Sequence, residues 1–241
     1  MDKQLLITGG ELTTDSQFII CRFSSPRLVL STSLFNGGYV IADSVFNHRL
    51  CFFVSSEGDL PGGCMEKYLA IMAGKRGLSM KRSTGLLTSA HMNCRGYSVV
   101  TYENLTVEVV ATAGVRENAT RAGEPACYFE DDGQYRQLGG TINILAFTNV
   151  RLPYGTMAKA LISITEAKTV ALEELGVVSP LTLKAATGTG TDGIILVGNQ
   201  DAAICCSDVG TQSKLGELFC VAVKTAVKQA LFLECDIKPL E

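Results

Sequence analysis

The sequence predicts an α+β fold, in which a mixed or antiparallel sheet, or more than one sheet, carries two long helices packed on it. Strand-like runs follow one another through the first half of the chain. Two long segments with apolar residues at helical spacing lie late in the chain, over about 154–175 and 213–234. Strands and helices do not alternate regularly, which argues against repeated βαβ units. A layered α/β sandwich is one arrangement that satisfies this pattern.

The composition is that of a folded protein, because 46% of the residues are hydrophobic and 19% are charged. A length of 241 residues suits one large domain or two small ones, and since no linker is visible we expect a single domain over residues 1–241. The net charge is −3 and there is no basic block, so no nucleic-acid partner is expected. No apolar run reaches the roughly 18 residues of a membrane span. The first residues lack the features of a signal peptide, and we therefore expect a cytoplasmic protein.

Metal and disulfide frameworks are not expected. The nine cysteines are odd in number and form no C-x-x-C pair. The only histidines are His48 and His91, so a site with three histidine ligands is impossible. We expect no metal ion and no cofactor bound by the protein itself.

Strands are predicted where β-branched and apolar residues lie between turn signals. The Asn36-Gly37 pair is such a turn signal. The segment 112–125 is long, polar and irregular, which is typical of a functional loop, and it is the candidate for a lid over the ligand. The predicted strands are 3–8, 17–23, 27–33, 85–90, 97–102, 105–113, 140–149 and 194–197, with a further short one at 204–206.

Three helices are predicted. Met65, Tyr68, Leu69 and Met72 share one helical face and begin the first helix. Pro153 suits the first turn of the helix at 154–175, and Ser213 is a suitable N-cap for the last one. Glu166 and Lys168 lie in the middle of the second helix, where they are either ordinary solvent-facing charges or functional groups.

A loop rich in threonine and glycine, over 184–193, is the most distinctive motif. Glycines permit φ > 0 and close approach of a ligand, and threonine hydroxyls both donate and accept hydrogen bonds. Asp192 closes the motif with a carboxylate, which can activate water. Backbone amides in the same loop can stabilise an oxyanion. The alternative is a plain tight turn, because turns are commonly made of these residues.

Other candidate side chains are polar and spread along the chain. His48 is the one near-neutral base within a polar motif, Asn47-His48-Arg49, and is either catalytic or structural. Asn143 lies inside a predicted strand, where a buried amide must find hydrogen-bond partners, so it is structural or it faces a ligand. Asn36 is either a turn residue or a ligand-binding residue.

Seven pieces of the sequence, in order over about residues 18–231, resemble the adenosylcobinamide amidohydrolase family. Each piece is short, and the specificity of the resemblance comes from their order and spacing. The pieces are Leu34–Tyr39, Asn47–Arg49, Thr112–Val115 with Asn118–Ala119 and Arg121–Ala126, Gly140–Asn143, Thr165–Lys168, Ala186–Gly193 and Ser213–Glu217.

The resemblance implies hydrolysis of the amide that joins the aminopropanol arm to the corrin ring of adenosylcobinamide. The products are adenosylcobyric acid and 1-amino-2-propanol, in corrinoid salvage and remodelling. The partner is then a small corrinoid, and its cobalt belongs to the substrate. Whether the chain forms a homo-oligomer is left open.

Roles for single residues follow from their chemistry. We expect Asp192, helped by His48 or Glu166, to activate the attacking water. A threonine nucleophile, Thr189 or a neighbouring threonine of the loop, is the second mechanism. Asparagine pairs with amides through both donor and acceptor, which suits the periphery of a corrin. The expected substrate-binding residues are Asn36, Asn47, Asn118, Asn143, Thr187, Gly188, Gly190, Thr191 and Lys214.

Two other functions remain open at this point. A non-catalytic corrinoid carrier or sensor would use the same pocket, and binding without product would indicate it. An enzyme that holds a phosphate in the Thr/Gly loop is disfavoured, because the loop lacks a P-loop lysine and the charge of Asp192 would repel phosphate.

Overall fold

The computed structural model describes residues 2–54, 56–116, 118–126 and 141–238. The helices within these ranges are α1 (Met65–Lys75), α2 (Tyr154–Glu174) and α3 (Lys214–Cys235), with two short 3-10 turns at Glu57–Asp59 and Met92–Cys94. The strands are β1 (Asp2–Leu5), β2 (Glu11–Thr14), β3 (Phe18–Ser31), β4 (Gly38–Arg49), β5 (Ser83–Thr88), β6 (Gly96–Tyr102), β7 (Leu105–Ala113), β8 (Ala119–Thr120), β9 (Ile142–Thr148), β10 (Gly188–Thr189) and β11 (Gly193–Val197).

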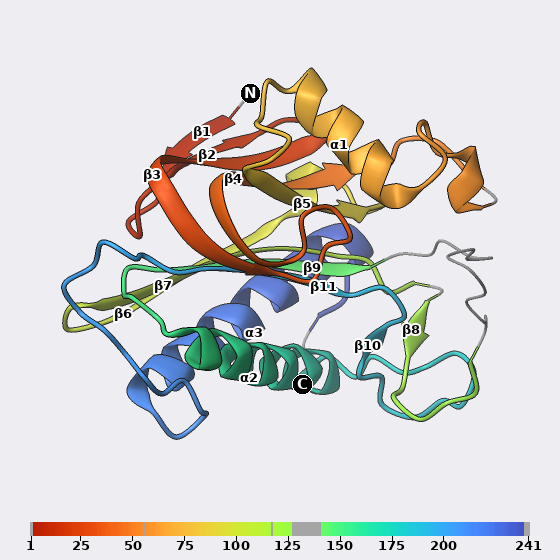
Figure 1. The fold of residues 1–241 in the computed structure, drawn as a ribbon. Helices are drawn as coiled ribbons and strands as arrows, with labels where there is room; N and C mark the ends of the chain where they lie inside the picture. Colours follow the sequence, from red (N-terminus) through yellow and green to blue (C-terminus); the bar gives the residue numbers. More distant parts are fainter. Residues whose placement is uncertain (1, 55, 117, 127–140, 239–241) are drawn as a thin grey trace.

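One mixed sheet contains nine of the described strands, in the order β1-β2-β3-β11-β9-β7-β6, with β4 paired to β3 and to β5. The strand β3 makes this sheet turn back on itself. Its register with β4 shifts between Arg22 and Arg27, so its first half pairs with β2 and its second half with β11. Such an irregularity bends a strand and increases its twist. The sheet therefore has two halves that face each other (Figure 1).

The described elements form four layers (Figure 1). Helices α2 and α3 pack together on one face of β6, β7 and β9. Successive side chains of β9 point to opposite faces of the sheet. Ile144 faces these helices, whereas Leu145 and Phe147 face the other half of the sheet. The outer face of β3, β4 and β5 is covered by α1. The predicted α+β fold, with a mixed sheet and two long helices packed on it, is confirmed.

Some element boundaries differ from the predictions. The predicted strands 17–23 and 27–33 are one continuous strand, β3, because the bend at its centre leaves the pairing with β4 in place on both sides. The predicted strand at 204–206 is reduced to a bridge between Cys205 and Arg151. Residues 50–54 follow β4 as a loop, although they are almost entirely apolar.

His48 belongs to the layer between β4 and α1. Its Nδ1 lies 3.1 Å from the carbonyl oxygen of Gln17, and its Nε2 lies 2.9 Å from the hydroxyl of Tyr68. Because a carbonyl only accepts, Nδ1 carries the proton and Nε2 accepts from the tyrosine. The ring also stacks on Phe18, with centroids 4.2 Å apart. Burial lowers the pKa of His48 from 6.5 to about 4, so the imidazole is neutral at neutral pH.

This buried neutral histidine predicts a loss of stability in mild acid. Between pH 6.5 and pH 4 the unfolded chain binds a proton at His48 that the folded chain does not bind. The free energy of unfolding is therefore highest above pH 6.5 and falls toward pH 4, by about 3 kcal/mol at 1.36 kcal/mol per pKa unit. The variant His48→Gln should lose much less stability over the same interval. Urea unfolding at several pH values measures both slopes, and equal slopes would contradict the assignment.

Candidate active site

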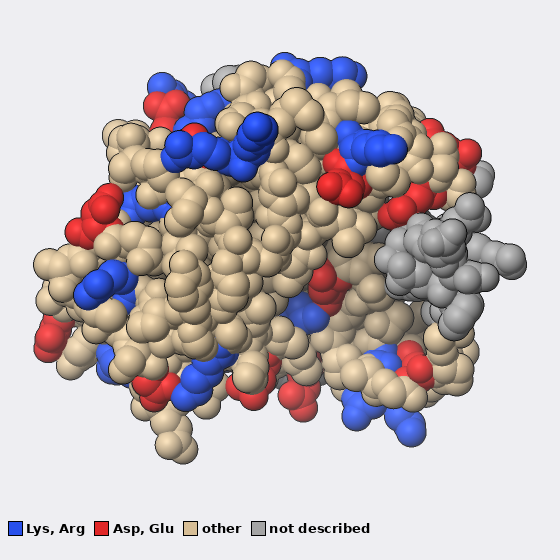
Figure 2. All heavy atoms as spheres, in the orientation of Figure 1, with Lys and Arg blue, Asp and Glu red and all other residues tan. Residues whose placement is uncertain are grey.

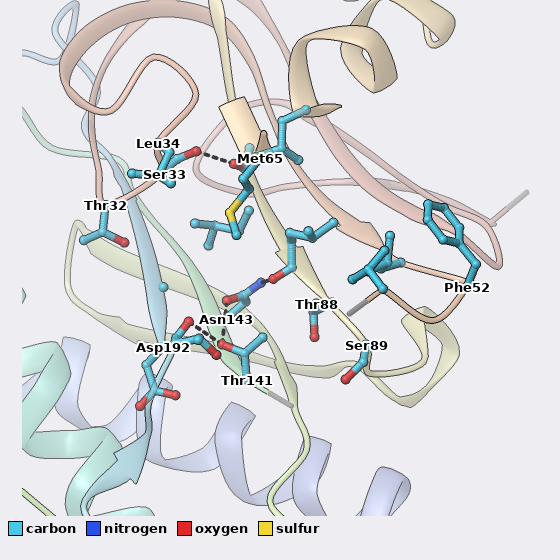
Figure 3. A pocket seen from close by; sticks show the side chains of 18 of the residues that line it. Thr32, Ser33, Leu34, Phe52, Met65, Thr88, Ser89, Thr141, Asn143 and Asp192 are labelled. Atoms are coloured by element: carbon cyan, nitrogen blue, oxygen red, sulfur yellow. Dashed lines mark hydrogen bonds between the residues drawn. The ribbon is translucent and has the colours of Figure 1, made fainter. Parts of the chain in front are cut away.

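A pocket of about 290 Å³ opens between the two halves of the sheet, at the end where β9 and β11 begin. Its walls come from the chain after β3, the loop after β4, the start of α1, the end of β5 and the first residues of β9 and β11. Figure 3 shows Thr141, Asn143 and Asp192 together on one side of it, with Phe52 and Met65 on others. The pocket thus has a polar side and an apolar side.

Asp192 belongs to the polar side, and several donors hold its carboxylate. Its Oδ2 forms an ion pair with Lys168 of α2. Its Oδ1 accepts from the hydroxyl of Thr189 at 2.5 Å and from the backbone N–H of Ile142 at 3.1 Å. The side chains of Lys168 and Asp192 are only 9% and 15% exposed. A buried charge requires such partners, because its removal from water is costly.

The backbone geometry of the Thr/Gly loop explains how Asp192 reaches these partners. The N–H of Thr189 also donates to both oxygens of Asp192, at 3.1 and 3.2 Å, so the loop folds back on its own carboxylate. A Cβ at Gly188 would lie 2.3 Å from Asp192 Oδ2 and 2.6 Å from Lys168 Nζ. A glycine is therefore needed at position 188 for the ion pair to form.

The segment 112–125 packs beside the Thr/Gly loop. Its strand β8 pairs with β10 in a short antiparallel ladder, in which Thr120 opposes Gly188. The N–H of Ala122 donates to the hydroxyl of Thr187 at 2.8 Å, and Arg121 donates to the carbonyl of Ala185 at 2.7 Å. Two motifs that are far apart in the sequence thus support one loop.

A buried chain of amides and hydroxyls lies next to the pocket, between the sheet halves. The amide nitrogen of Asn143 donates to the side-chain oxygen of Asn47 at 2.8 Å and to the carbonyl of Leu87 at 3.0 Å. Asn47 in turn donates to the hydroxyl of Thr112 at 2.8 Å. Both amide hydrogens of Asn143 are used, so its side chain offers the pocket an oxygen acceptor.

Several of the expected residues lie together. Asn143, Thr191 and Asp192 line the pocket, and Asn47 binds Asn143 behind it. The loop that holds Asp192 contains the other expected residues of the Thr/Gly motif, namely Thr187, Gly188, Thr189 and Gly190. Asn118 is half-buried directly before β8, beside the same loop.

Four other expected residues lie elsewhere. His48 faces α1, because it follows Asn47 in β4 and successive side chains of a strand point to opposite faces. Glu166 is exposed on α2, two residues before Lys168 and thus on a different face of the helix. Neither is placed to help Asp192. Asn36 is a turn residue with φ 50°, and its amide donates to the carbonyls of Met80 and Ser83.

Lys214 is also distant from the pocket. It begins α3, forms an ion pair with Glu217, and its Nζ lies 4.6 Å from the ring centroid of Tyr102. Tyr102 lies at the end of the sheet where β9 finishes, as the register of Val107 with Thr148 shows. Asp192 precedes β11, which runs parallel to β9, and so lies at the opposite end.

Sequence reasoning missed two residues of the site. The sequence leaves Lys168 open as a solvent-facing charge or a functional group, and it is not among the expected site residues, but it is 7% exposed and pairs with Asp192. Its position between the apolar Ala167 and Ala171 of the buried face was the available signal. Thr141 is buried, and its hydroxyl donates to the carbonyl of Thr191 at 2.5 Å. Figure 2 shows acidic and basic side chains scattered over one face of the molecule among many uncharged ones.

The described residues contain neither a membrane-spanning helix nor a metal-binding cluster. None of their helices combines the length and the apolar character needed to cross a membrane. No cluster of three or more His, Cys, Asp or Glu side chains in the described ranges is arranged to hold a metal ion.

Two solved structures align with most of the chain, each at 12% identity and a TM-score of 0.43. One is the crystal structure of the PH0078 protein from Pyrococcus horikoshii OT3, with 96% of this chain and 80% of that chain covered. The other is a beta-aminopeptidase of Burkholderia sp., with 90% and 79% covered. At this level the likeness supports no conclusion about function.

The sequence comparisons cover the chain almost completely. The uncharacterized protein MJ1613 of Methanocaldococcus jannaschii is 31% identical over 245 residues, which are 94% of this chain and 90% of the relative. The model of the adenosylcobinamide amidohydrolase family matches residues 3–239. The protein therefore belongs to the adenosylcobinamide amidohydrolase family, whose activity is amide hydrolysis on a corrinoid.

Proposed function

We propose that this protein hydrolyses the amide between the aminopropanol arm and the corrin ring of adenosylcobinamide. The products are adenosylcobyric acid and 1-amino-2-propanol, which return to cobamide synthesis in salvage or remodelling. The bond that breaks is a C–N bond of a linear amide. The observation that carries the proposal is the Asp192 carboxylate, held by Lys168 and Thr189 on the polar side of a pocket between the sheet halves.

The geometry favours water as the nucleophile and Asp192 as its base. Asp192 lines the pocket and is therefore within reach of a water molecule there. The carboxylate takes a proton from the water while the hydroxide oxygen attacks the amide carbonyl carbon. The protonated Asp192 then gives this proton to the leaving nitrogen as the C–N bond breaks. Lys168 keeps the carboxylate in position and balances its charge.

Stabilisation of the tetrahedral oxyanion is assigned to backbone amides of the Thr/Gly loop. The N–H of Thr189 already donates to Asp192, and that of Thr187 donates to the carbonyl of Thr120, so we assign the oxyanion to the amide of Gly190. Gly190 is exposed, and no atom lies within 4 Å of the position that a Cβ would take there, so its backbone is open to a ligand. The corrin periphery is rich in amides, and the oxygen of Asn143 is the acceptor that the pocket offers them.

A threonine nucleophile is the second mechanism, and one contact favours Thr189 among the loop threonines. Its hydroxyl donates to Asp192 Oδ1 at 2.5 Å, so the carboxylate could take its proton directly. This route forms an acyl-enzyme ester, which mass spectrometry would detect. The variant Thr189→Ala would lose all turnover in this mechanism, whereas water attack would leave measurable turnover.

We also propose that the protein is a cytoplasmic enzyme of one domain. It needs no cofactor, and cobalt is present only in the substrate. Its partner is the corrinoid, with no role for nucleic acid or a membrane. The alternative function is a corrinoid carrier or sensor with the same pocket and no turnover.

Purified protein treated with a chelator should convert adenosylcobinamide to products. Mass spectrometry should show adenosylcobyric acid and free 1-amino-2-propanol in equal amounts. Activity in the presence of the chelator would exclude a required exchangeable metal ion. Binding without product, also after metals are restored, would favour the carrier. Absence of both binding and product would contradict the proposed substrate.

Asp192→Asn should lower kcat by about 10²–10⁴-fold, which is the usual contribution of a general base. The corrinoid should still bind, because the amide keeps the shape of the side chain. The variant also leaves the buried Lys168 charge unpaired, so its Tm should fall, and both assays are run at a temperature where the variant is folded. Spectroscopic titration with adenosylcobinamide measures the affinity, and the product assay measures the rate. A loss of affinity as large as the loss of rate would assign Asp192 to binding or to structure.

Lys168→Met should destabilise the fold, because it leaves the buried Asp192 charge without its cation. The expected cost is about 3 kcal/mol, which corresponds to a decrease in Tm of about 6–12 °C. The double variant Lys168→Met with Asp192→Asn should recover part of this loss, since no unpaired charge remains. Glu173→Gln, at an exposed position of the same helix, is the control and should leave Tm unchanged.

Additive losses in the double variant would contradict a direct pairing of Lys168 with Asp192 in solution. In the activity assay the double variant should be as inactive as Asp192→Asn alone. Recovered stability without recovered activity separates the structural role of the pair from the chemical role of the carboxylate.

A further inference from the structure

The pocket is too small for the whole proposed substrate. Its volume of about 290 Å³ lies at the lower end of the range for pockets that bind drug-sized ligands, about 300–1,000 Å³. A corrin ring with its side chains and an adenosyl group is several times larger. The pocket can hold the amide and its aminopropanol arm, and the ring must then lie outside, against the residues around the opening.

The apolar side of the pocket presents large side chains to solvent. Phe53 is 89% exposed, Leu34 is 53% exposed and Phe52 is 47% exposed, and all three line the same pocket as Asp192. Large exposed apolar side chains around a pocket are characteristic of a ligand-binding surface. We refer to these three lining residues, Leu34, Phe52 and Phe53, as the apolar platform; Figure 3 shows Leu34 and Phe52 on opposite sides of the pocket.

The loop that carries the two phenylalanines is held on both sides of Phe53. The ring of Phe52 packs edge-on against Tyr68 of α1, with centroids 6.2 Å apart. Val54 is 7% exposed and belongs to the core between α1 and the sheet. Leu50, at the start of the loop, donates its N–H to the carbonyl of Thr88 at 2.8 Å. Both neighbours of Phe53 are thus held by packing, and the side chain of Phe53 between them is exposed to solvent.

We propose that the apolar platform is the binding surface for the corrin ring, which rests on Phe53 while the aminopropanol arm enters the pocket toward Asp192. This inference rests on the proposed function. The ring brings a flat conjugated face and a methylated edge, and both gain free energy by covering exposed aromatic carbon. The arm then meets the polar side, so the two sides of the pocket bind two chemically different parts of one substrate.

The platform predicts a change in KM with kcat preserved. Phe53→Ala should raise the KM for adenosylcobinamide about tenfold, because ring contacts are present equally in the ground state and the transition state. Its kcat should stay within about twofold of that of the unchanged protein. Phe53→Tyr keeps the ring and should restore the KM. The product adenosylcobyric acid retains the corrin but lacks the arm, so its inhibition constant should rise by the same factor in Phe53→Ala.

The matched control is Phe232→Ala, which removes a phenylalanine that is 46% exposed on α3 and does not line the pocket. It should change neither KM nor kcat. Turnover by Phe53→Ala with an unchanged KM would overturn the platform and leave the hydrolase function intact. An equal effect of Phe232→Ala would also overturn it. If the unchanged protein shows no turnover, the dissociation constant of adenosylcobinamide tests the platform alone, and equal values for unchanged protein and Phe53→Ala would refute it.

Discussion

The ion pair between Asp192 and Lys168 is the interaction on which the geometry of the pocket depends. It joins the loop before β11 to α2, and the same carboxylate accepts from the first N–H of β9 and from Thr189. Because both charges are nearly buried, neither can lose its partner without a large cost. The pair therefore keeps the Thr/Gly loop against α2, and it leaves the carboxylate at the polar side of the pocket.

The bend in β3 provides the space in which this site lies. By pairing with β2 in its first half and with β11 in its second, β3 turns one sheet into two facing halves. Most of the space between them is filled by apolar residues such as Leu145 and Phe147. At one end the amides of Asn47 and Asn143 replace them, and there the pocket opens. A polar end to an otherwise apolar interior is what an amide substrate requires.

The division of the pocket into a polar side and an apolar side connects the proposed chemistry with substrate recognition. In the proposed binding mode, Asp192 acts on a small group, whereas the bulk of the corrinoid lies outside the pocket on exposed carbon such as that of Phe53. In this proposal, binding free energy gained at the ring lowers the KM for the substrate. His48, although it lies in a motif that resembles the family, contributes to the layer between β4 and α1 instead.

Local patterns in the sequence determined the helices, most of the strands and the Thr/Gly loop, because periodicity, caps and turn residues act over a few positions. They also indicated Asp192, since a carboxylate that ends a glycine-rich loop is visible without a structure. Only the tertiary structure decided its partner, because the choice between Lys168, Glu166 and His48 depends on which face of α2 or β4 meets the loop. The curl of the sheet and the platform at Phe53 were likewise decided by contacts between distant segments, which a single sequence does not record.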